Sequence, residues 1–165
     1  MANSDSGRNT PPLADPRAAR RAIRSGEHPH HTAGVAPGYV QANVCILPGD
    51  WADEFMRFCH RNPKPCPLLA RSEPGDPRLP QLAQDLDIRT DVPQYHVFRD
   101  GELKETRSDI RDLWREDLVA FALGCSFSFE EALVEAGVPL KHLARGDYHR
   151  RHKVAAEEKV QSMNV

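Results

Sequence analysis

Proline is concentrated in one stretch of this sequence, and that stretch restricts the fold more than any other feature does. Seven of the 14 prolines in the 165-residue chain lie between residues 63 and 93. Because proline has no backbone N–H and a fixed φ, this stretch cannot be interior helix or central strand. We expect an extended, turn-rich layer that contains one short strand at residues 67–70.

Two helices are predicted ahead of this layer. Asp15 followed by Pro16 is typical of an N-cap and first helical position, which predicts a helix over residues 17–25. Asp50 is expected to cap a second helix, which ends at Asn62. The apolar face of this second helix is expected to contain Trp51, Phe55, Phe58 and Cys59.

The chain also carries strand patterns. Residues 39–47 are rich in β-branched and apolar side chains, which favours a strand. Asp-Gly at 100–101 predicts a tight hairpin between residues 95–99 and 102–106, because glycine accepts a positive φ. Residues 117–123 form an apolar run that we interpret as a buried helix. Together, these elements predict a mixed α/β fold with short helices around the strands.

Charge and cysteine content exclude several classes of protein. The net charge is −2, from 22 basic and 24 acidic residues, so no overall nucleic-acid-binding surface is indicated. No run approaches the roughly 18 apolar residues that span a bilayer, and the polar N-terminus does not resemble a secretory signal. We therefore expect a cytoplasmic protein without nucleic-acid or membrane partners. The four cysteines form no CxxC pair, so we expect free thiols, no metal site and no cofactor.

The segment 124–131, Gly-Cys-Ser-Phe-Ser-Phe-Glu-Glu, is the most informative part of the chain. Ser128 and Glu131 fit a capping box, which predicts a helix over residues 129–136. Backbone N–H groups at a helix start bind carboxylates or phosphates, and the hydroxyls of Ser126 and Ser128 add further donors.

Two side chains of the same segment are candidates for proton transfer. Cys125 lies close to the expected helix start, which can activate a thiol, and Glu130 in the first turn can act as a general acid or base. The alternative is structural. In that case Ser128 only caps the helix, Phe127 and Phe129 fill the core, and Cys125 is a small buried residue.

Two further segments are candidates for ligand binding. Lys64 lies between two prolines that stiffen its backbone toward an anion, and Asn62 offers both a donor and an acceptor. The alternative is a rigid surface turn with a solvated lysine. Gln41 and Asn43 share one face of a predicted strand, where they either line a polar pocket or satisfy neighbouring backbone groups.

Four long motifs, in this order, resemble a known family. They are TAGVAPGYVQANVCILP (32–48), FCHRNPKPCPLL (58–69), DIRTDVPQYHVFRDGEL (87–103) and DLVAFALGCSFSFEEALVEAGVPLKH (117–142). They resemble the bacterial putative hydro-lyases, a family related to a domain of mitochondrial D-glutamate cyclase, over about residues 17–146. The resemblance implies an α/β fold and a carbon–oxygen lyase activity. The related cyclase converts D-glutamate into 5-oxo-D-proline with loss of water.

The chemistry of such a reaction, rather than the resemblance, selects the candidate site residues. Loss of water from a small carboxylate needs donors for the carboxyl group and groups that transfer protons. The catalytic candidates are Cys125 and Glu130. The substrate-binding candidates are Ser126, Ser128, Asn62, Lys64 and Asn43.

Family members run considerably longer than this chain, and the resemblance stops near residue 146. We expect a disordered N-terminus over residues 1–14, the N-terminal part of a hydro-lyase domain over residues 15–146, and a divergent tail over residues 147–165. The alternatives to a lyase are a non-catalytic, truncated remnant and a module that binds a small carboxylate. A chain without its second half is expected to expose apolar surface, and so to form a homo-oligomer or to be poorly soluble.

Overall fold

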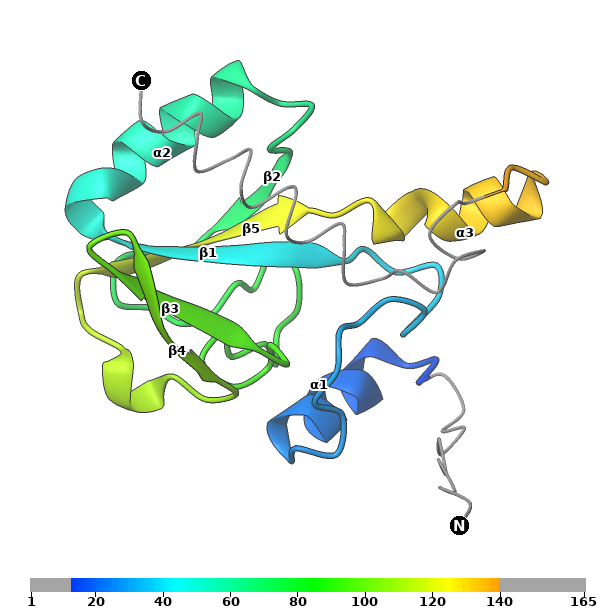
Figure 1. The fold of residues 1–165 in the computed structure, drawn as a ribbon, viewed down its shortest axis with the longest axis horizontal. Helices are drawn as coiled ribbons and strands as arrows, with labels where there is room; N and C mark the ends of the chain where they lie inside the picture. The colour runs from blue at the N-terminus through cyan, green and yellow to red at the C-terminus, as the bar shows by residue number, and fades with distance from the viewer. Residues whose placement is uncertain (1–12, 140–165) are drawn as a thin grey trace, which may run out of the picture. The chain divides into compact units, whose positions relative to one another are not determined.

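The computed structural model describes residues 13–139 of the chain. Contacts within the chain define two compact units, which divide between Ser128 and Phe129. The first unit contains a three-stranded antiparallel sheet with the order β1-β5-β2 and a two-stranded sheet of β3 and β4 (Figure 1). Helices and sheets in one chain confirm the predicted α/β class.

Strand β5 (Leu118–Gly124) is the centre of the larger sheet. It lies between β1 (Ala42–Pro48) and β2 (Leu68–Arg71), and all of its residues except the last are buried. The interpretation of residues 117–123 as a helix is therefore wrong. A strand that is covered on both faces loses the polar–apolar alternation of a half-exposed strand, so its short apolar run resembles that of a buried helix.

Helix α2 (Gly49–Arg61) covers one face of this sheet. Ala52 of α2 packs against Phe121 of β5, and the Phe55 ring lies edge-on to the Phe121 ring with the centroids 5.0 Å apart. Phe55 therefore faces the core as predicted, but Trp51 is 62% exposed and does not. The buried face is centred on Ala52 because its small side chain lets the helix lie close to the sheet.

The ends of α2 differ in how well the sequence predicts them. Asp50 is not the cap, because β1 runs directly into the helix at Pro48, where no side chain makes a capping bond. Asp50 lies instead in the first turn, where the helix dipole favours a negative charge. The predicted end is confirmed: the Asn62 N–H bonds back to the carbonyl oxygen of Phe58, and Pro63 follows.

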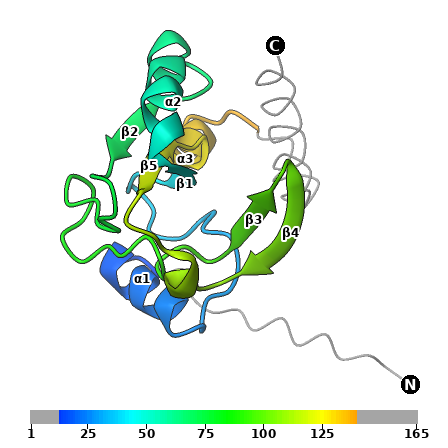
Figure 2. The ribbon, with the colours of Figure 1, turned by 90° about the vertical axis from the view of Figure 1, so that its left-hand side faces the viewer.

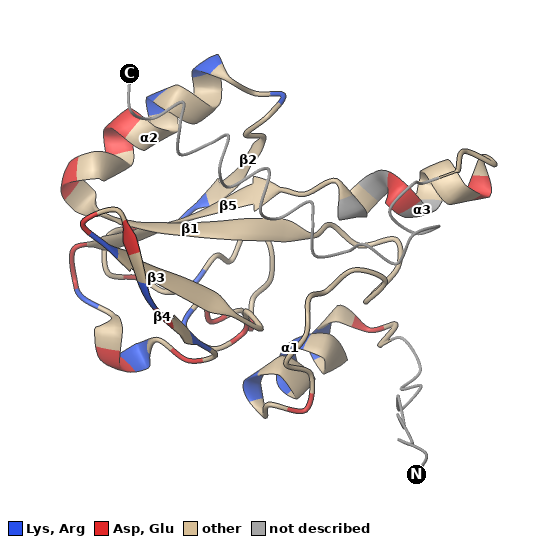
Figure 3. Cartoon of the chain, in the orientation of Figure 1, with Lys and Arg blue, Asp and Glu red and all other residues tan. Residues whose placement is uncertain are grey.

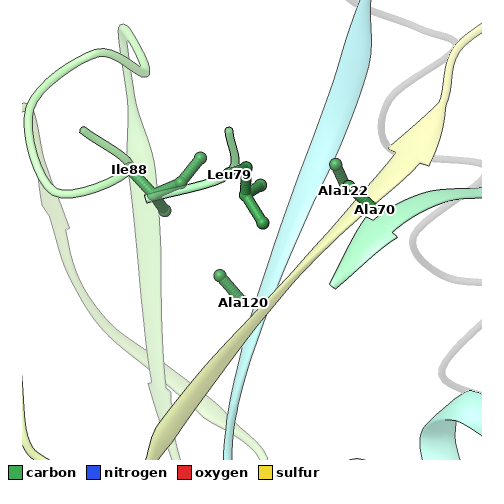
Figure 4. Close-up of a cluster of buried hydrophobic side chains, with 5 residues drawn as sticks. All are labelled: Ala70, Leu79, Ile88, Ala120 and Ala122. Carbon is green, nitrogen blue, oxygen red and sulfur yellow. The ribbon is translucent and has the colours of Figure 1, made fainter. Parts of the chain in front are cut away.

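The Pro-rich layer covers the other face of the sheet. Leu79 and Ile88 of this layer form a buried cluster with Ala120 and Ala122 of β5 and Ala70 of β2 (Figure 4). Alanines on the sheet leave room for the two larger side chains above them. The predicted short strand in this layer is confirmed as β2, at residues 68–71 instead of 67–70.

Gly75 joins the Pro-rich layer to the beginning of β5. Its φ is +77°, and a Cβ at this position would lie 2.8 Å from the carbonyl oxygen of Glu116. Its N–H donates to the Leu118 carbonyl at 2.8 Å, and its own carbonyl accepts the Trp114 indole N–H at 2.9 Å. The approach of the two backbones requires glycine here.

Helix α1 (Pro16–Arg24) is tied to the Pro-rich layer by an ion pair. Asp15 caps the helix as predicted, since its carboxylate accepts two backbone N–H groups of the first turn. Arg24 donates to both carboxylate oxygens of Asp91, at 2.8 and 2.6 Å, and the Asp91 side chain is fully buried. The N–H of Asp87 also donates to Asp91, so this carboxylate is well satisfied.

The predicted hairpin is confirmed. Strands β3 (Tyr95–Arg99) and β4 (Glu102–Arg107) pair as a separate two-stranded sheet (Figure 2). Asp100 and Gly101 between them both have positive φ, at 53° and 76°, as a type I′ turn requires. A short 3₁₀ helix, η1 (Arg111–Leu113), leads from the hairpin toward β5.

The last described helix is α3 (Phe127–Glu135). A helix was predicted here, but it begins at residue 127 and not at 129, so Ser128 lies inside the first turn. Beyond residue 128 the described part of the second unit is the rest of this helix and the residues that end it, where Gly137 has a φ of 75°. Among the described residues, no helix is long and apolar enough to cross a membrane.

The burial of β5 predicts a strong contrast between two phenylalanines. Phe121→Ala should lower the free energy of unfolding by about 3–5 kcal/mol, because it removes a fully buried ring from the centre of the sheet. Phe98→Ala should change it by less than about 0.5 kcal/mol, since the Phe98 ring is 60% exposed. Urea denaturation measures both. Equal losses would contradict the central place of β5.

Acid should destabilise the protein through its arginine-paired aspartates. The side-chain hydrogen bond from Arg78 lowers the pKa of Asp76 to about 2, and the pKa of Asp85 is lowered in the same way by Arg20. Burial raises the pKa of Asp87, but its bonds with Arg89 outweigh this and lower it overall.

Because these pKa values are lower in the folded state, the unfolded chain binds more protons as the pH falls below about 4. The stabilisation is therefore complete above that pH and is lost as the pH falls toward 2. The melting temperature should decrease over this range. Arg78→Met should make the decrease shallower, and an unchanged profile in that variant would contradict the role of the Asp76 pair.

Candidate functional site

Three segments that the sequence singled out meet at one end of the three-stranded sheet. Because β5 is antiparallel to both neighbours, its C-terminal end lies beside the N-terminal ends of β1 and β2 (Figure 1). We call residues 41–43, 62–67 and 124–128 the sheet end. Two backbone hydrogen bonds join its parts: Gly124 N–H to the Pro67 carbonyl at 2.8 Å, and Cys125 N–H to the Gln41 carbonyl at 3.1 Å.

Ser128 connects the end of β5 to the beginning of β1. Its hydroxyl donates to the Gln41 carbonyl at 3.2 Å and accepts the Gln41 N–H at 2.9 Å. The hydroxyl is thus directed to the backbone of Gln41, whereas the capping box predicts a bond to Glu131. The side chain of Glu131 lies outside the described residues. Ser128 therefore ties the first turn of α3 to the backbone of Gln41.

Gln41 extends this connection to the loop before β1. Its side-chain oxygen accepts the Thr32 hydroxyl proton at 2.7 Å, and its side-chain N–H donates to the Val35 carbonyl at 3.2 Å. Of the two alternatives for Gln41, the structure supports bonding to neighbouring backbone. Within the same loop, Ala36 has a φ of 48°, which is unusual for a residue with a Cβ and is held by its N–H bond to Leu13.

The two residues between Gly124 and α3 are only partly covered. Cys125 and Ser126 both have intermediate exposure, and Cys125 is a free thiol. Glu130, the other catalytic candidate, belongs to the second unit, where it lies in the first turn of α3 with its side chain buried. The structure thus places Cys125 and Ser126 at the sheet end.

The loop before β2 contributes one structural residue and one exposed charge. The Asn62 side-chain N–H donates to the Phe58 carbonyl at 2.9 Å, and the Asn62 backbone carbonyl accepts the Cys66 N–H at 3.0 Å, so Asn62 closes α2. Lys64 is exposed. A surface depression beside this loop is lined by Cys59, His60, Pro63, Pro67 and Leu68.

Asn43, the last binding candidate, is exposed on β1 opposite Leu123 of β5. Strands β1 and β5 themselves carry no charged residue, as Figure 3 shows. Lys64 is therefore the only charged side chain in the three segments of the sheet end. The polar side chains that are exposed or partly exposed at this end include those of Asn43, Lys64 and Ser126.

No group of three or more His, Cys, Asp or Glu side chains placed to hold a metal ion occurs among residues 13–139.

The sequence patterns missed Thr32 as a partner of Gln41. The conformation of the loop between them brings Thr32 and Gln41 together. A spacing of nine residues does not by itself predict such a hydrogen bond, because many threonine and glutamine pairs share it.

Comparison with known proteins identifies a family model and several relatives that match this chain. A family model described as D-glutamate cyclase matches residues 119–160, which include all of β5 except Leu118, the turn after it and α3. A protein from Afipia carboxidovorans named "Putative hydro-lyase" is 60% identical over 134 residues, which are 81% of this chain and 49% of that protein.

Two further relatives carry the same name. The protein from Verminephrobacter eiseniae is 61% identical over 134 residues, covering 81% of this chain and 49% of its own length. The protein from Rhizobium johnstonii is 56% identical over 144 residues, covering 87% and 54%. This chain therefore spans about half the length of the curated relatives that it matches.

The resemblance to the bacterial hydro-lyases is thus confirmed. Over about four fifths of its length, the chain is 60% to 61% identical to proteins named putative hydro-lyase. The three segments of the sheet end all lie within the motifs that carried this resemblance.

The Ser128–Gln41 connection predicts a local effect of mutation. Ser128→Ala removes both hydrogen bonds to the Gln41 backbone and should cost about 1–2 kcal/mol of stability. The Gln41 amide should also exchange with solvent about tenfold faster, which NMR hydrogen exchange measures. Cys125→Ala is the matched control, because it keeps every backbone bond of the turn. Unchanged Gln41 exchange in Ser128→Ala would contradict the assignment.

Proposed function

We propose that the chain acts as a hydro-lyase on a small carboxylate or amino acid, and that the specific reaction is a loss of water like that catalysed by D-glutamate cyclase. The observation that supports this most is the convergence of three chemically suited segments at one end of a sheet, in a sequence of the hydro-lyase family. The family model named for D-glutamate cyclase supports the choice of D-glutamate.

The reaction sets clear chemical requirements. In dehydrative cyclisation, the amine nitrogen attacks the side-chain carboxyl carbon, a C–N bond forms, and one carboxyl oxygen leaves as water. Donors must hold the carboxyl oxygens as charge develops on them, and an acid must protonate the departing oxygen. A base must take a proton from the amine nitrogen.

The sheet end offers hydrogen-bond donors and the Cys125 thiol, whereas the other catalytic candidate, Glu130, belongs to the second unit. In this proposal, the Ser126 hydroxyl and the N–H groups at the start of α3 bind a carboxylate, and Lys64 adds a positive charge on the neighbouring loop. Cys125 and Glu130 transfer protons. Ser128 keeps the turn in place through Gln41 and so acts as a positioning residue.

The other two binding candidates have unequal support. Asn43 projects from the exposed start of β1 and is proposed to bind the substrate's polar groups. Asn62 uses its side-chain N–H to close α2, so its proposed part is to orient the loop that carries Lys64. The part of each relative that this chain matches is about half of that relative, so the activity proposed here is that of the whole family protein.

Turnover of D-glutamate by the full chain tests the proposal. Formation of 5-oxo-D-proline, followed by NMR, should be seen with D-glutamate. Cys125→Ala and Glu130→Gln should each lower the rate by a factor of about 10² or more, as for loss of a general acid or base. Cys45→Ala is the matched control, since this thiol lies in the middle of β1, away from the sheet end.

Two other outcomes are informative. Binding of D-glutamate by the folded chain without turnover would favour the carboxylate-binding module over the lyase. Neither binding nor turnover of D-glutamate would contradict the proposed substrate.

A further inference from the structure

Among residues 13–139, strand β1 has a partner strand on only one side. Within the described residues, it pairs with β5 along its whole length and forms the edge of the three-stranded sheet. The opposite edge is β2, which has only four residues and an irregularity between Leu68 and Ala70. An edge strand presents a row of N–H and C=O groups that can pair with another strand.

The register shows which groups form this row. Cys125 N–H donates to the Gln41 carbonyl, so this pair is hydrogen-bonded, and in an antiparallel ladder such pairs alternate. Asn43, Cys45 and Leu47 therefore bond to β5. The backbone groups that point toward the open edge are those of Ala42, Val44 and Ile46.

The other side of β5 agrees with this assignment. Gly124 N–H bonds to the Pro67 carbonyl, and the Ser72 N–H bonds to the Ala120 carbonyl. Even-numbered residues of β5 thus bond toward β2, and odd-numbered residues bond toward β1. Pro48, which has no N–H, ends the outward row of β1.

This edge lacks the features that usually prevent strand pairing. Proteins protect exposed edges with charged residues, prolines or bulges. Strand β1 has no charged residue, an uninterrupted register with β5, and no proline before Pro48. Tyr39 and Val40, just before this strand, are 56% and 67% exposed, so the chain leading into the edge also carries exposed apolar side chains. In contrast, four of the six residues in β4 (ELKETR) are charged.

The relatives indicate what covers this edge. The aligned region is 46% to 54% of their lengths, so each relative carries about as much polypeptide again. We propose that the open edge of β1 is the pairing site for a strand from the part of the hydro-lyase polypeptide that this chain does not match. Within one relative, that strand is held at high effective concentration, which favours it over a second copy of the chain.

Co-expression tests this pairing. The tagged 165-residue chain is expressed together with the part of the Afipia carboxidovorans protein that it does not match, and the two should co-purify in a 1:1 ratio. In the complex, the amides of Ala42, Val44 and Ile46 should exchange with solvent at least about tenfold more slowly than in the chain alone. The alternate amides of β1 should not change, since they already bond to β5.

A pair of variants at one position provides the control. Ala42→Pro removes one outward N–H and places a ring at the edge without touching the bonds to β5, so it should weaken the complex about tenfold or more. Ala42→Ser keeps the N–H and should bind as the original chain does.

Four results would overturn the proposal. The first is failure of the two polypeptides to co-purify, and the second is a complex in which the amides of Ala42, Val44 and Ile46 still exchange fast. The third is slow exchange of these amides in the chain alone at any concentration. The fourth is exchange in the chain alone that becomes slower as the concentration of the chain increases. The last result would instead identify a second copy as the occupant.

Discussion

The structure of the first unit depends on the burial of β5 from both sides. One face of this strand packs against α2 and the other against the Pro-rich layer, while β1 and β2 satisfy its backbone. Burial of apolar area is the main favourable contribution to folding, and here it is concentrated in six consecutive residues. Because β1 and β2 both pair with this strand, β5 determines the positions of the residues that form the sheet end, including the turn after residue 124.

Features that depend on neighbouring residues were predictable from the sequence. The Asp15 cap, the Asp100-Gly101 turn and the end of α2 at Asn62 all follow from the conformational preferences of a few adjacent residues. The extended layer followed from proline chemistry alone. The chemistry of their residues singled out the three segments of the candidate site, although spacing could not show that they lie at one sheet end.

Features that depend on distant residues were not predictable. Whether residues 117–123 are helix or strand is decided by β1 and β2, which lie more than 40 residues away in the sequence. The direction of the Ser128 hydroxyl depends on Gln41 in the same way. In each case a local pattern had two physically reasonable outcomes, and a tertiary contact selected one of them.

Gly75 has a consequence for how this fold can change during evolution. With a positive φ and the Glu116 carbonyl in the place where a side chain would begin, no other residue can be accommodated without moving the segment that leads into β5. A lineage would need two coordinated changes, in elements about 40 residues apart, to replace it. This position can therefore record common ancestry among distant homologues whose ligand-contacting residues have already diverged.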